Sequence, residues 1–385
     1  MKILVINSGS SSLKCSLFEL PQARELAECV VERIGVGKSS LTYTAGGRSD
    51  QRACKADTHR EALDVALERL LEGDGQVLES LDEIAAVGHR VVHGGEKISE
   101  SVAVDQEVIG VIRENIALAP LHNPPNLMGL EAALERLPGT LQVAVFDTAF
   151  HASMPPRAYL YALPHRLYTQ HHIRRYGFHG TSHRHVAERA AQLLKMPLSE
   201  CNLITLHLGN GCSAAAVRGG RSIDTTMGMT PLEGLVMGTR CGDIDPALPY
   251  LLTESLEMSA KQVYDMLNRQ SGLAGLSGVS NDMREVVAAA AAGNAWAERA
   301  LEVFCYRIKK CIGAYWAALG RLDGLVFTAG IGENCAEVRR RVCEGMGGLG
   351  LRLDERKNQE ALARDAVISA ADSRVAVLVV PTNEE

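Results

Sequence analysis

The sequence lacks the features that mark several large classes of protein. Its ten cysteines are scattered without a CxxC pair, which favours reduced thiols over a zinc site or a disulfide framework. No block of lysine and arginine stands out and the net charge is −6, which argues against a nucleic-acid scaffold. No secretory leader is visible, and the first apolar run is far too short to cross a bilayer. We therefore expect a cytoplasmic protein that binds neither nucleic acid nor a membrane.

What is present is the composition of an ordinary globular protein, and its 385 residues predict two or three domains. The stretch HLGNGCS at 207–213 stands between the apolar runs 203–206 and 214–217. This pattern predicts two strands joined by a tight loop. Glycines in such a loop let the backbone approach phosphate oxygens, although the loop could also be only a turn.

The beginning of the chain has the same design. The apolar run 3–6 leads into NSGSSS at 7–12, and a second apolar run follows at 13–18. Serine hydroxyls, backbone amides and the charge of Lys14 could hold phosphate oxygens or metal-bound water. Because one such hairpin stands near the beginning of each half, we hypothesise a duplicated chain whose halves face each other across a cleft and bring both loops to one nucleotide.

Single polar residues follow other predicted strands. Arg90, after the strand 84–87, could serve an anion site or could be a surface arginine. Asp147 follows the strand 141–146, and open α/β sheets place ligand-facing groups at that end of a strand. Arg240 lies in a glycine-flanked loop, and loops of this length in compact domains are usually functional.

The histidine-rich span 165–185 contains a possible metal pair, but its sequence favours another role. His179 and His183 are spaced as in a helical zinc site, yet the glutamate of a zincin is missing between them. We predict instead that His179 lies in a loop just before a helix that Thr181 or Ser182 caps.

Apolar periodicity predicts the main helices and one further turn. Helices are expected at 58–72, 105–117, 126–136, 246–257, 259–269, 281–292, 296–320 and 336–343. Residues 328–334 are expected to form a glycine-containing turn that permits close approach of a phosphorylated ligand. The stretch 345–350 matches GxGxxG, but it follows a helix rather than a strand, so we reject it as a dinucleotide site.

Taken together, these stretches resemble the acetate kinase family, in the superfamily that also holds sugar kinases, heat-shock chaperones and actin. The matching motifs run through nearly the whole chain: NSGSSSLK (7–14), GHRVVHGGE (88–96), LAPLHNPPN (118–126), VFDTAFH (145–151), YGFHGTSH (176–183), HLGNGCS (207–213), MGMTPLEGLVMGTRCGDIDP (227–246), GVSNDMRE (278–285) and FTAGIGEN (327–334).

The resemblance assigns a role to each matching position. It implies catalytic roles for Asp147, His179, Arg240 and Arg90, and we assign Asp147 to orienting Arg240 or a metal-bound water. The resemblance places the acid against Arg90, Val92, Leu121, Phe178 and Pro231, and a metal at Asn7 and Glu384. It places the nucleotide at Lys14, His207, Leu208, Gly209, Asn210, Gly211, Asp282, Met283, Arg284, Gly330, Ile331, Gly332, Glu333 and Asn334.

The resemblance also implies the fold and the reaction. The fold would be α/β, with two duplicated actin-like (ribonuclease H-like) domains of mixed sheets flanked by helices. The N-terminal domain would span residues 1–148 and the nucleotide-binding domain 149–383, with residues 384–385 returning to the first. Relatives usually continue past this point as a final helix that supports that return. A homodimer is implied as well.

The implied reaction is reversible, Mg²⁺-dependent transfer of the ATP γ-phosphate to acetate, with Mn²⁺ as a possible substitute for Mg²⁺. A propionate or butyrate kinase with the same machinery is the alternative. An ATP-switched binding protein of the chaperone or actin kind is a further hypothesis, but it does not account for Arg90, Asp147, His179 and Arg240 together. Trapping an acyl phosphate with hydroxylamine would discriminate between these classes.

Overall fold

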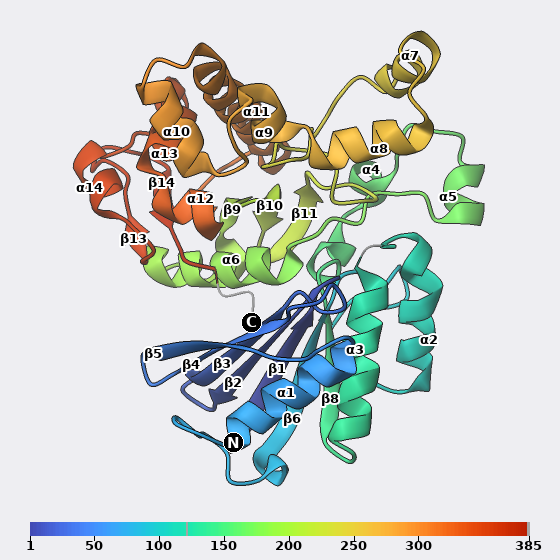
Figure 1. Ribbon diagram of the computed structural model, residues 1–385. Helices are drawn as coiled ribbons and strands as arrows, with labels where there is room; N and C mark the ends of the chain where they lie inside the picture. The colour runs from blue at the N-terminus through green and yellow to red at the C-terminus, as the bar shows by residue number, and fades with distance from the viewer. Residues whose placement is uncertain (121, 383–385) are drawn as a thin grey trace. The chain divides into compact units, whose positions relative to one another are not determined.

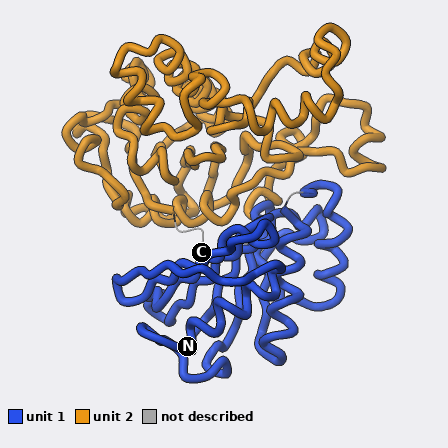
Figure 2. The backbone as a smooth tube through the Cα atoms, in the orientation of Figure 1, with its two compact units in different colours: residues 1–149, 385 blue, residues 150–384 orange. Residues whose placement is uncertain are grey.

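The computed structural model describes residues 1–120 and 122–382, which form two compact units. Met1–Ala149 make up the first unit, and the second begins at Phe150 (Figure 2). The domain boundary expected between residues 148 and 149 differs from this division by a single residue. Two predicted site residues, Leu121 and Glu384, lie outside the described residues.

The first unit is built on an eight-stranded mixed sheet with the order β5-β4-β3-β2-β1-β6-β8-β7. Strands β1 to β5 form an antiparallel meander, whereas β6 and β8 continue the sheet parallel to β1 and β7 pairs antiparallel at the edge. The strands are β1 (Lys2–Ser8), β2 (Ser12–Glu19), β3 (Arg24–Glu32), β4 (Ser40–Ala45), β5 (Arg48–Ala53), β6 (Ile84–Val91), β7 (Val102–Ala103) and β8 (Leu141–Phe146).

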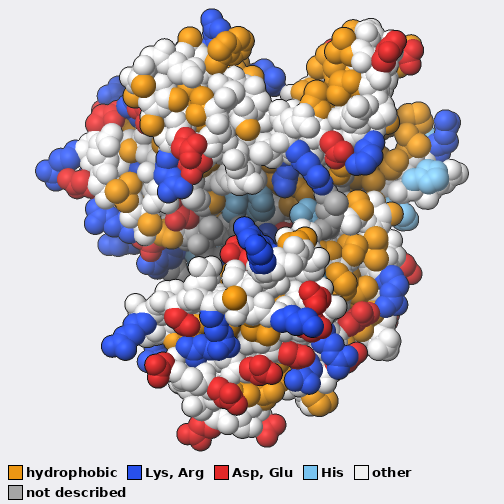
Figure 3. Space-filling view, in the orientation of Figure 1, with side chains coloured by type: hydrophobic (Ala, Val, Ile, Leu, Met, Phe, Trp, Pro, Cys, Tyr) orange, Lys and Arg blue, Asp and Glu red, His pale blue; other side chains and the backbone are white. Residues whose placement is uncertain are grey.

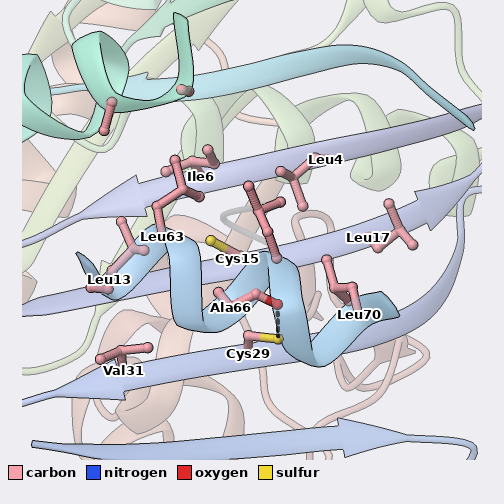
Figure 4. Packing of buried hydrophobic residues seen from close by; sticks show 14 of the residues in the cluster. Leu4, Ile6, Leu13, Cys15, Leu17, Cys29, Val31, Leu63, Ala66 and Leu70 are labelled. Atoms are coloured by element: carbon pink, nitrogen blue, oxygen red, sulfur yellow. Dashed lines mark hydrogen bonds between the residues drawn. The ribbon is translucent and has the colours of Figure 1, made fainter. Parts of the chain in front are cut away.

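Three α-helices belong to this unit: α1 (His59–Leu71), α2 (Gln106–Glu114) and α3 (Asn123–Arg136), with 3₁₀ turns at Leu81–Glu83 and Asn115–Ala117. Helix α1 packs Leu63, Ala66 and Leu70 against the sheet (Figure 4). Alternate residues of β1, β2 and β3 face them, among them Leu4 and Cys29, since successive side chains of a strand point to opposite faces. Each leucine buried in this way contributes about 2 kcal/mol.

Helix α3 begins earlier than its apolar periodicity indicates. It was expected at 126–136 but starts at Asn123, so that Pro124 and Pro125 lie in its first turn. Proline is tolerated there because the first N–H groups of a helix have no partner inside the helix. This early start adds Asn123 to the helix one turn before Asn126. The two asparagine side chains bond the Ser8 carbonyl at the end of β1 and the backbone of Val92 and His93 just after β6.

The second unit repeats the architecture of the first. Its six-stranded sheet has the order β11-β10-β9-β12-β14-β13. The meander β9-β10-β11 matches β1-β2-β3, the parallel strands β12 and β14 match β6 and β8, and an antiparallel edge strand closes the sheet again. The strands are β9 (Asn202–Leu208), β10 (Cys212–Arg218), β11 (Arg221–Thr225), β12 (Gly324–Thr328), β13 (Ala366–Val367) and β14 (Ala376–Val379). The duplication inferred from the two hairpins is therefore confirmed.

Helices lie on both sides of this second sheet (Figure 1). Helix α6 packs Val186 and Ala190 against β9 and β10, while α11 packs against the same two strands from the other side. The α-helices are α4 (Pro156–Tyr159), α5 (Arg166–His171), α6 (Gly180–Leu194), α7 (Leu248–Ser255), α8 (Ala260–Arg269), α9 (Gly272–Ser277), α10 (Met283–Ala291), α11 (Ala295–Leu319), α12 (Ala329–Asn334), α13 (Ala336–Cys343) and α14 (Glu355–Glu360). Short 3₁₀ turns occur at Ala149–Ser153, Leu198–Glu200 and Met346–Leu349.

The predicted helices at 296–320 and 336–343 are confirmed by α11 and α13. The turn expected at 328–334 is instead a short helix, α12, which packs against β9 and β12. Hydrophobic side chains are exposed along α7, namely those of Leu248, Tyr250 and Leu251 (Figure 3). In the described part of the chain, no helix is both long enough and apolar enough to span a membrane.

Candidate active site

Arg90 and Asp147 form a paired site at the carboxyl ends of β6 and β8. Arg90 Nε and Nη2 donate to Asp147 Oδ1 and Oδ2, both at 3.0 Å. The Asp147 side chain is 3% exposed and the Arg90 side chain 19%. A two-pronged pair of this kind fixes the plane of the guanidinium as well as its position. The sequence did not predict this pair, because 57 residues separate its members.

Asn126 links this region to the end of β1. Its Oδ1 accepts from the Val92 backbone N–H at 3.0 Å, and its Nδ2 donates to the Ser8 carbonyl at 2.8 Å. Asn123, one turn earlier on α3, holds both backbone polar groups of His93. These asparagines position the loop after Arg90, and the sequence analysis did not single them out.

The other predicted groups of the first unit are the metal position Asn7 and the phosphate contact Lys14. Asn7 lies near the end of β1 and is the register partner of Arg90 on β6. Lys14 lies on β2, and its Nζ is 2.7 Å from Glu28 Oε1 on β3. Because both side chains are about one-third exposed, this ion pair stabilises the fold little, and Lys14 can exchange partners at small cost.

His179 lies at the amino end of α6 in the left-handed region, with φ of 57°. Its Nδ1 is 2.8 Å from Ser213 Oγ, and its ring stacks on that of His207 with centroids 4.0 Å apart. The prediction that Thr181 or Ser182 caps the helix is wrong: α6 begins at Gly180, and Ser182 lies inside its first turn. Ser182 instead bonds His207 Nδ1 at 2.8 Å and thereby orients that ring.

Arg240 lies close to His179 across Gly211. A Cβ atom on Gly211 would lie 3.4 Å from His179 Cε1 and Nε2 and 3.6 Å from Arg240 Nη1. Nη1 of Arg240 donates to the Pro231 carbonyl at 3.1 Å, and no carboxylate of the described residues contributes to its electrostatic surroundings. Burial lowers the pKa of Arg240, but an arginine remains charged at neutral pH. The second unit thus presents a cation and an imidazole side by side.

A cavity of about 820 Å³ opens next to this loop, entirely within the second unit. Its volume falls in the range of small-molecule sites. Eight of the predicted nucleotide residues line it: Gly209, Asn210, Asp282, Met283, Arg284, Gly330, Ile331 and Asn334. Further lining residues, which sequence reasoning missed, are Asn281, Val287, Cys335, Ala336, Glu337, Gln359 and Leu362.

The remaining predicted nucleotide residues lie elsewhere. Lys14 belongs to the first unit, whereas His207 and Gly211 flank the loop that forms one wall of the cavity. The Leu208 side chain has no exposed surface, and Glu333 is largely buried, with its Oε1 accepting from the Thr382 backbone N–H. The cavity surface therefore does not include the buried residues Leu208, Gly332 and Glu333, which lie behind it.

Two polar contacts shape the cavity wall around Asp282. Its carboxylate accepts from the Arg284 backbone N–H, which caps α10, and also bonds the Arg284 guanidinium. These bonds lower the pKa of Asp282 to about 2, so the group is ionised at neutral pH. Asn281 Nδ2 donates to Asn210 Oδ1 at 3.1 Å and joins this wall to the glycine-rich loop.

Arg339 stabilises the part of the cavity wall that α12 and the α14 segment form, although its own side chain does not line the cavity. This fully buried residue of α13 donates to the carbonyls of Gly332 and Glu333 on α12 and to those of Asn358 and Ala361 at α14. Its Nε also donates to Asn358 Oδ1 at 2.8 Å. Gln359 and Leu362 reach the cavity from the segment that Arg339 holds.

Both sheets contain an antiparallel meander, two parallel strands and an antiparallel edge strand, and each has a glycine-containing hairpin loop. With a small-molecule cavity beside one of these loops, this is the architecture of the duplicated actin-like fold. A sequence profile of the acetokinase family matches residues 2–385. The chain belongs to the acetokinase family.

Individual relatives agree with this assignment. The acetate kinase of Thermotoga maritima is 52% identical over 387 aligned positions, covering all of this chain and 96% of the relative. The crystal structure of the Porphyromonas gingivalis acetate kinase is 46% identical, with a TM-score of 0.96 over all of this chain and 96% of that one. A propionate kinase from Francisella tularensis is 41% identical, with a TM-score of 0.93 over all of this chain and 97% of that one.

Proposed function

We propose that this protein is an acetate kinase, which transfers the γ-phosphate of ATP to acetate and forms acetyl phosphate and ADP. The observation that carries the proposal is the approach of Arg240 and His179 to the same glycine, next to a cavity that fits a nucleotide. Full-length identity near one half to enzymes named acetate kinase supports the same substrate.

The chemistry explains why two arginines are needed. Acetate is ionised at neutral pH, so one of its oxygens can attack the γ-phosphorus without a base, and the bond to the β-phosphate oxygen breaks as ADP leaves. The obstacle is repulsion between the carboxylate and the phosphate. Arg90, held by Asp147, would bind the carboxylate, and Arg240 would offset the charge of the transferring group.

His179 and Arg240 would act on the equatorial oxygens of that group. Phosphoryl transfer depends mainly on positioning and on stabilising charge in the transition state, so hydrogen-bond donors placed beforehand are worth more than a base. Asp147 then acts by orienting Arg90, with which it pairs, rather than Arg240 as expected from the sequence. No proton needs to move for the reaction to proceed in either direction.

The donor set suits Mg²⁺, which we propose as the metal, with Mn²⁺ as a possible substitute. Among the described residues, no three His, Cys, Asp or Glu side chains lie close enough together to hold a metal ion. Mg²⁺ bound to a nucleotide needs only one or two oxygen ligands from the protein, since phosphates and water complete its shell. Asn7 supplies an amide oxygen, and Glu384 is the proposed carboxylate. When bound, the ion would neutralise phosphate charge.

The activity is tested by trapping the product with hydroxylamine. With ATP, Mg²⁺ and acetate, we expect steady formation of acetohydroxamate, and none without acetate. Consumption of ATP without hydroxamate, or no turnover in the presence of bound ATP, would instead favour an ATP-switched binding protein.

Val92 offers a test of acid size, since it is proposed to border the methyl group of acetate. Val92→Ala should improve propionate and butyrate relative to acetate by about tenfold or more, because a methylene in an apolar pocket is worth roughly 1–3 kcal/mol. The measurement is kcat/KM for the three acids. If the parent already prefers propionate to acetate, the result supports the alternative function, in line with the likeness to a propionate kinase. Equal ratios of kcat/KM for the three acids in parent and variant would show that Val92 does not border the methyl group.

We also propose that the protein is cytoplasmic and works as a homodimer. The absence of a membrane-spanning helix from the described residues is compatible with the first proposal, and the exposed apolar side chains of α7 are compatible with a subunit contact. Light scattering after gel filtration measures the mass directly, and a mass of one chain would contradict the dimer.

A further inference from the structure

A buried chain of hydrogen bonds runs from the core of the second unit to His179. Thr205 Oγ1 on β9 is 2.7 Å from His183 Nδ1, and His183 Nε2 is 2.8 Å from Ser213 Oγ on β10. Ser213 Oγ is in turn 2.8 Å from His179 Nδ1. Thr205, His183 and Ser213 have no exposed surface, so water cannot replace any of these contacts.

We infer that Thr205, His183 and Ser213 are positioning residues, which set neutral His179 in the tautomer that carries its proton on Nε2. This inference rests on the proposed function, because it concerns how His179 meets the transferring phosphoryl group. The three residues do not touch substrate in this scheme. They decide which ring nitrogen of His179 can donate.

His183 has one donor and one acceptor because it stays neutral. Complete burial, with His151 and His207 nearby, keeps its pKa well below the ordinary value for histidine. A neutral imidazole carries a single N–H, and its other nitrogen accepts. The two bonds of His183, to Thr205 and to Ser213, must therefore run in the same direction.

The direction of the hydrogen bond between His183 and Ser213 determines the direction of the bond between Ser213 and His179. A hydroxyl has a single proton, and among the described residues the two imidazole nitrogens are the only hydrogen-bond partners of Ser213 Oγ. Ser213 therefore donates to one of the two rings and accepts from the other. Only two arrangements of the protons satisfy every hydrogen bond from Thr205 to His179. Either each group donates towards His179, whose Nδ1 then accepts, or each donates away from it and His179 Nδ1 carries the proton.

The surroundings of His179 and its proposed role select the first arrangement. Arg240 Nη1 approaches the same glycine as the His179 ring, and the His207 ring stacks on it. A neighbouring cation disfavours a second positive charge on the ring, which favours the neutral form that the inference assigns to His179. A neutral ring can donate to a phosphoryl oxygen from Nε2 only if Nδ1 accepts. Ser213 therefore donates to His179, His183 Nε2 donates to Ser213, and Thr205 donates to His183.

Nitrogen-15 NMR of the protein labelled at histidine reads the tautomers directly. We expect neutral His179 and His183, both protonated at Nε2, at pH 7.5. His151 is an internal reference, because its Nε2 lies 3.0 Å from the Phe178 carbonyl, which can only accept. A proton on Nδ1 of His179 or His183, or a doubly protonated His179, overturns the inference.

Ser213→Ala tests the consequence for catalysis, with Ser222→Ala as the matched control. Both serines are fully buried in the same sheet and both bond a histidine, but Ser222 bonds His151 Nδ1 rather than His179. Ser213→Ala should release the His179 tautomer and lower kcat by about 10- to 100-fold, the range seen when the partner that orients a metal-ligating histidine is removed. The KM for ATP should change little, and Ser222→Ala should stay within about twofold of the parent.

The two readouts separate this inference from the proposed function. The tautomers of the parent protein are measured without substrate, so they decide the inference even if Ser213→Ala does not fold or no acetyl phosphate forms. If hydroxamate forms and the tautomers are the expected ones, but Ser213→Ala keeps its kcat, the chain does not position His179 for catalysis and the inference fails. If the tautomers are as expected but no hydroxamate forms, the proposed function fails instead.

Discussion

Replacing Arg240 with alanine is expected to lower kcat by about 10³- to 10⁵-fold, the range measured for arginines that meet a transferring phosphoryl group. The deficit should lie in kcat rather than in the KM for ATP, because the charge that Arg240 offsets is greatest in the transition state. Its position supports this expectation: the guanidinium bonds a backbone carbonyl and is not neutralised by any carboxylate among the described residues.

Two further variants make this prediction specific. Arg240→Lys keeps the charge but loses the planar fork, so it should recover only part of the activity, and added guanidinium should partly rescue Arg240→Ala. Arg269→Ala removes an exposed arginine from α8 and should leave kcat unchanged. If folded Arg240→Ala keeps kcat within a few-fold of the parent, Arg240 does not act on the phosphoryl group.

Replacing Arg339 with methionine is expected to lower the free energy of unfolding of the second unit by about 3 kcal/mol or more. Methionine fills much of the space but leaves four carbonyls and the Asn358 side chain without their donor. Each buried polar group left without a partner costs about 1–3 kcal/mol. Because these carbonyls belong to both α12 and the α14 segment, the KM for ATP should also rise while that for acetate changes little.

Arg340→Met is the matched control in the same helix. Arg340 is partly exposed and pairs with Glu337 three residues earlier, and such pairs contribute about 0.3–0.5 kcal/mol. Urea unfolding followed by fluorescence, together with the KM for each substrate, compares the two variants. Equal losses of stability would show that the buried hydrogen bonds of Arg339 contribute no more than a surface ion pair.

The sequence was sufficient for the features that depend on short-range pattern. Apolar periodicity predicted α11 and α13, and the two glycine-containing hairpins predicted the duplication. The short helix α12 was missed because two of its six residues are glycine, which disfavours a helix in isolation. It is held by the carbonyl contacts of Arg339, which lie outside its own sequence.

The parts of the site that the sequence did not reveal are joined over long separations. Ser213 and His179 are 34 residues apart, and Asn126 and Ser8 are 118 apart. Arg339 was hidden for another reason: it is the first of three consecutive arginines, and such a run usually indicates a solvated face of a helix. Only the packing of α12 and α14 around α13 turns this one arginine inward.

The cavity lined by residues 209–362 is assembled from one unit alone, and this has a consequence for how the family can diversify. Asn281, Val287, Gln359 and Leu362 can change without disturbing the Arg90–Asp147 pair or the asparagines that hold Val92. Selection for a different purine or a different phosphate donor would then leave the proposed acid contacts of the first unit, Arg90 and Val92, intact. Mutations that alter Val92 or Asn126 could likewise shift the acid while the nucleotide stays the same. The proposed acid contacts Phe178 and Pro231 belong to the second unit, so only the part of the acid site that the first unit carries can drift, or be recombined between relatives, independently of the nucleotide cavity.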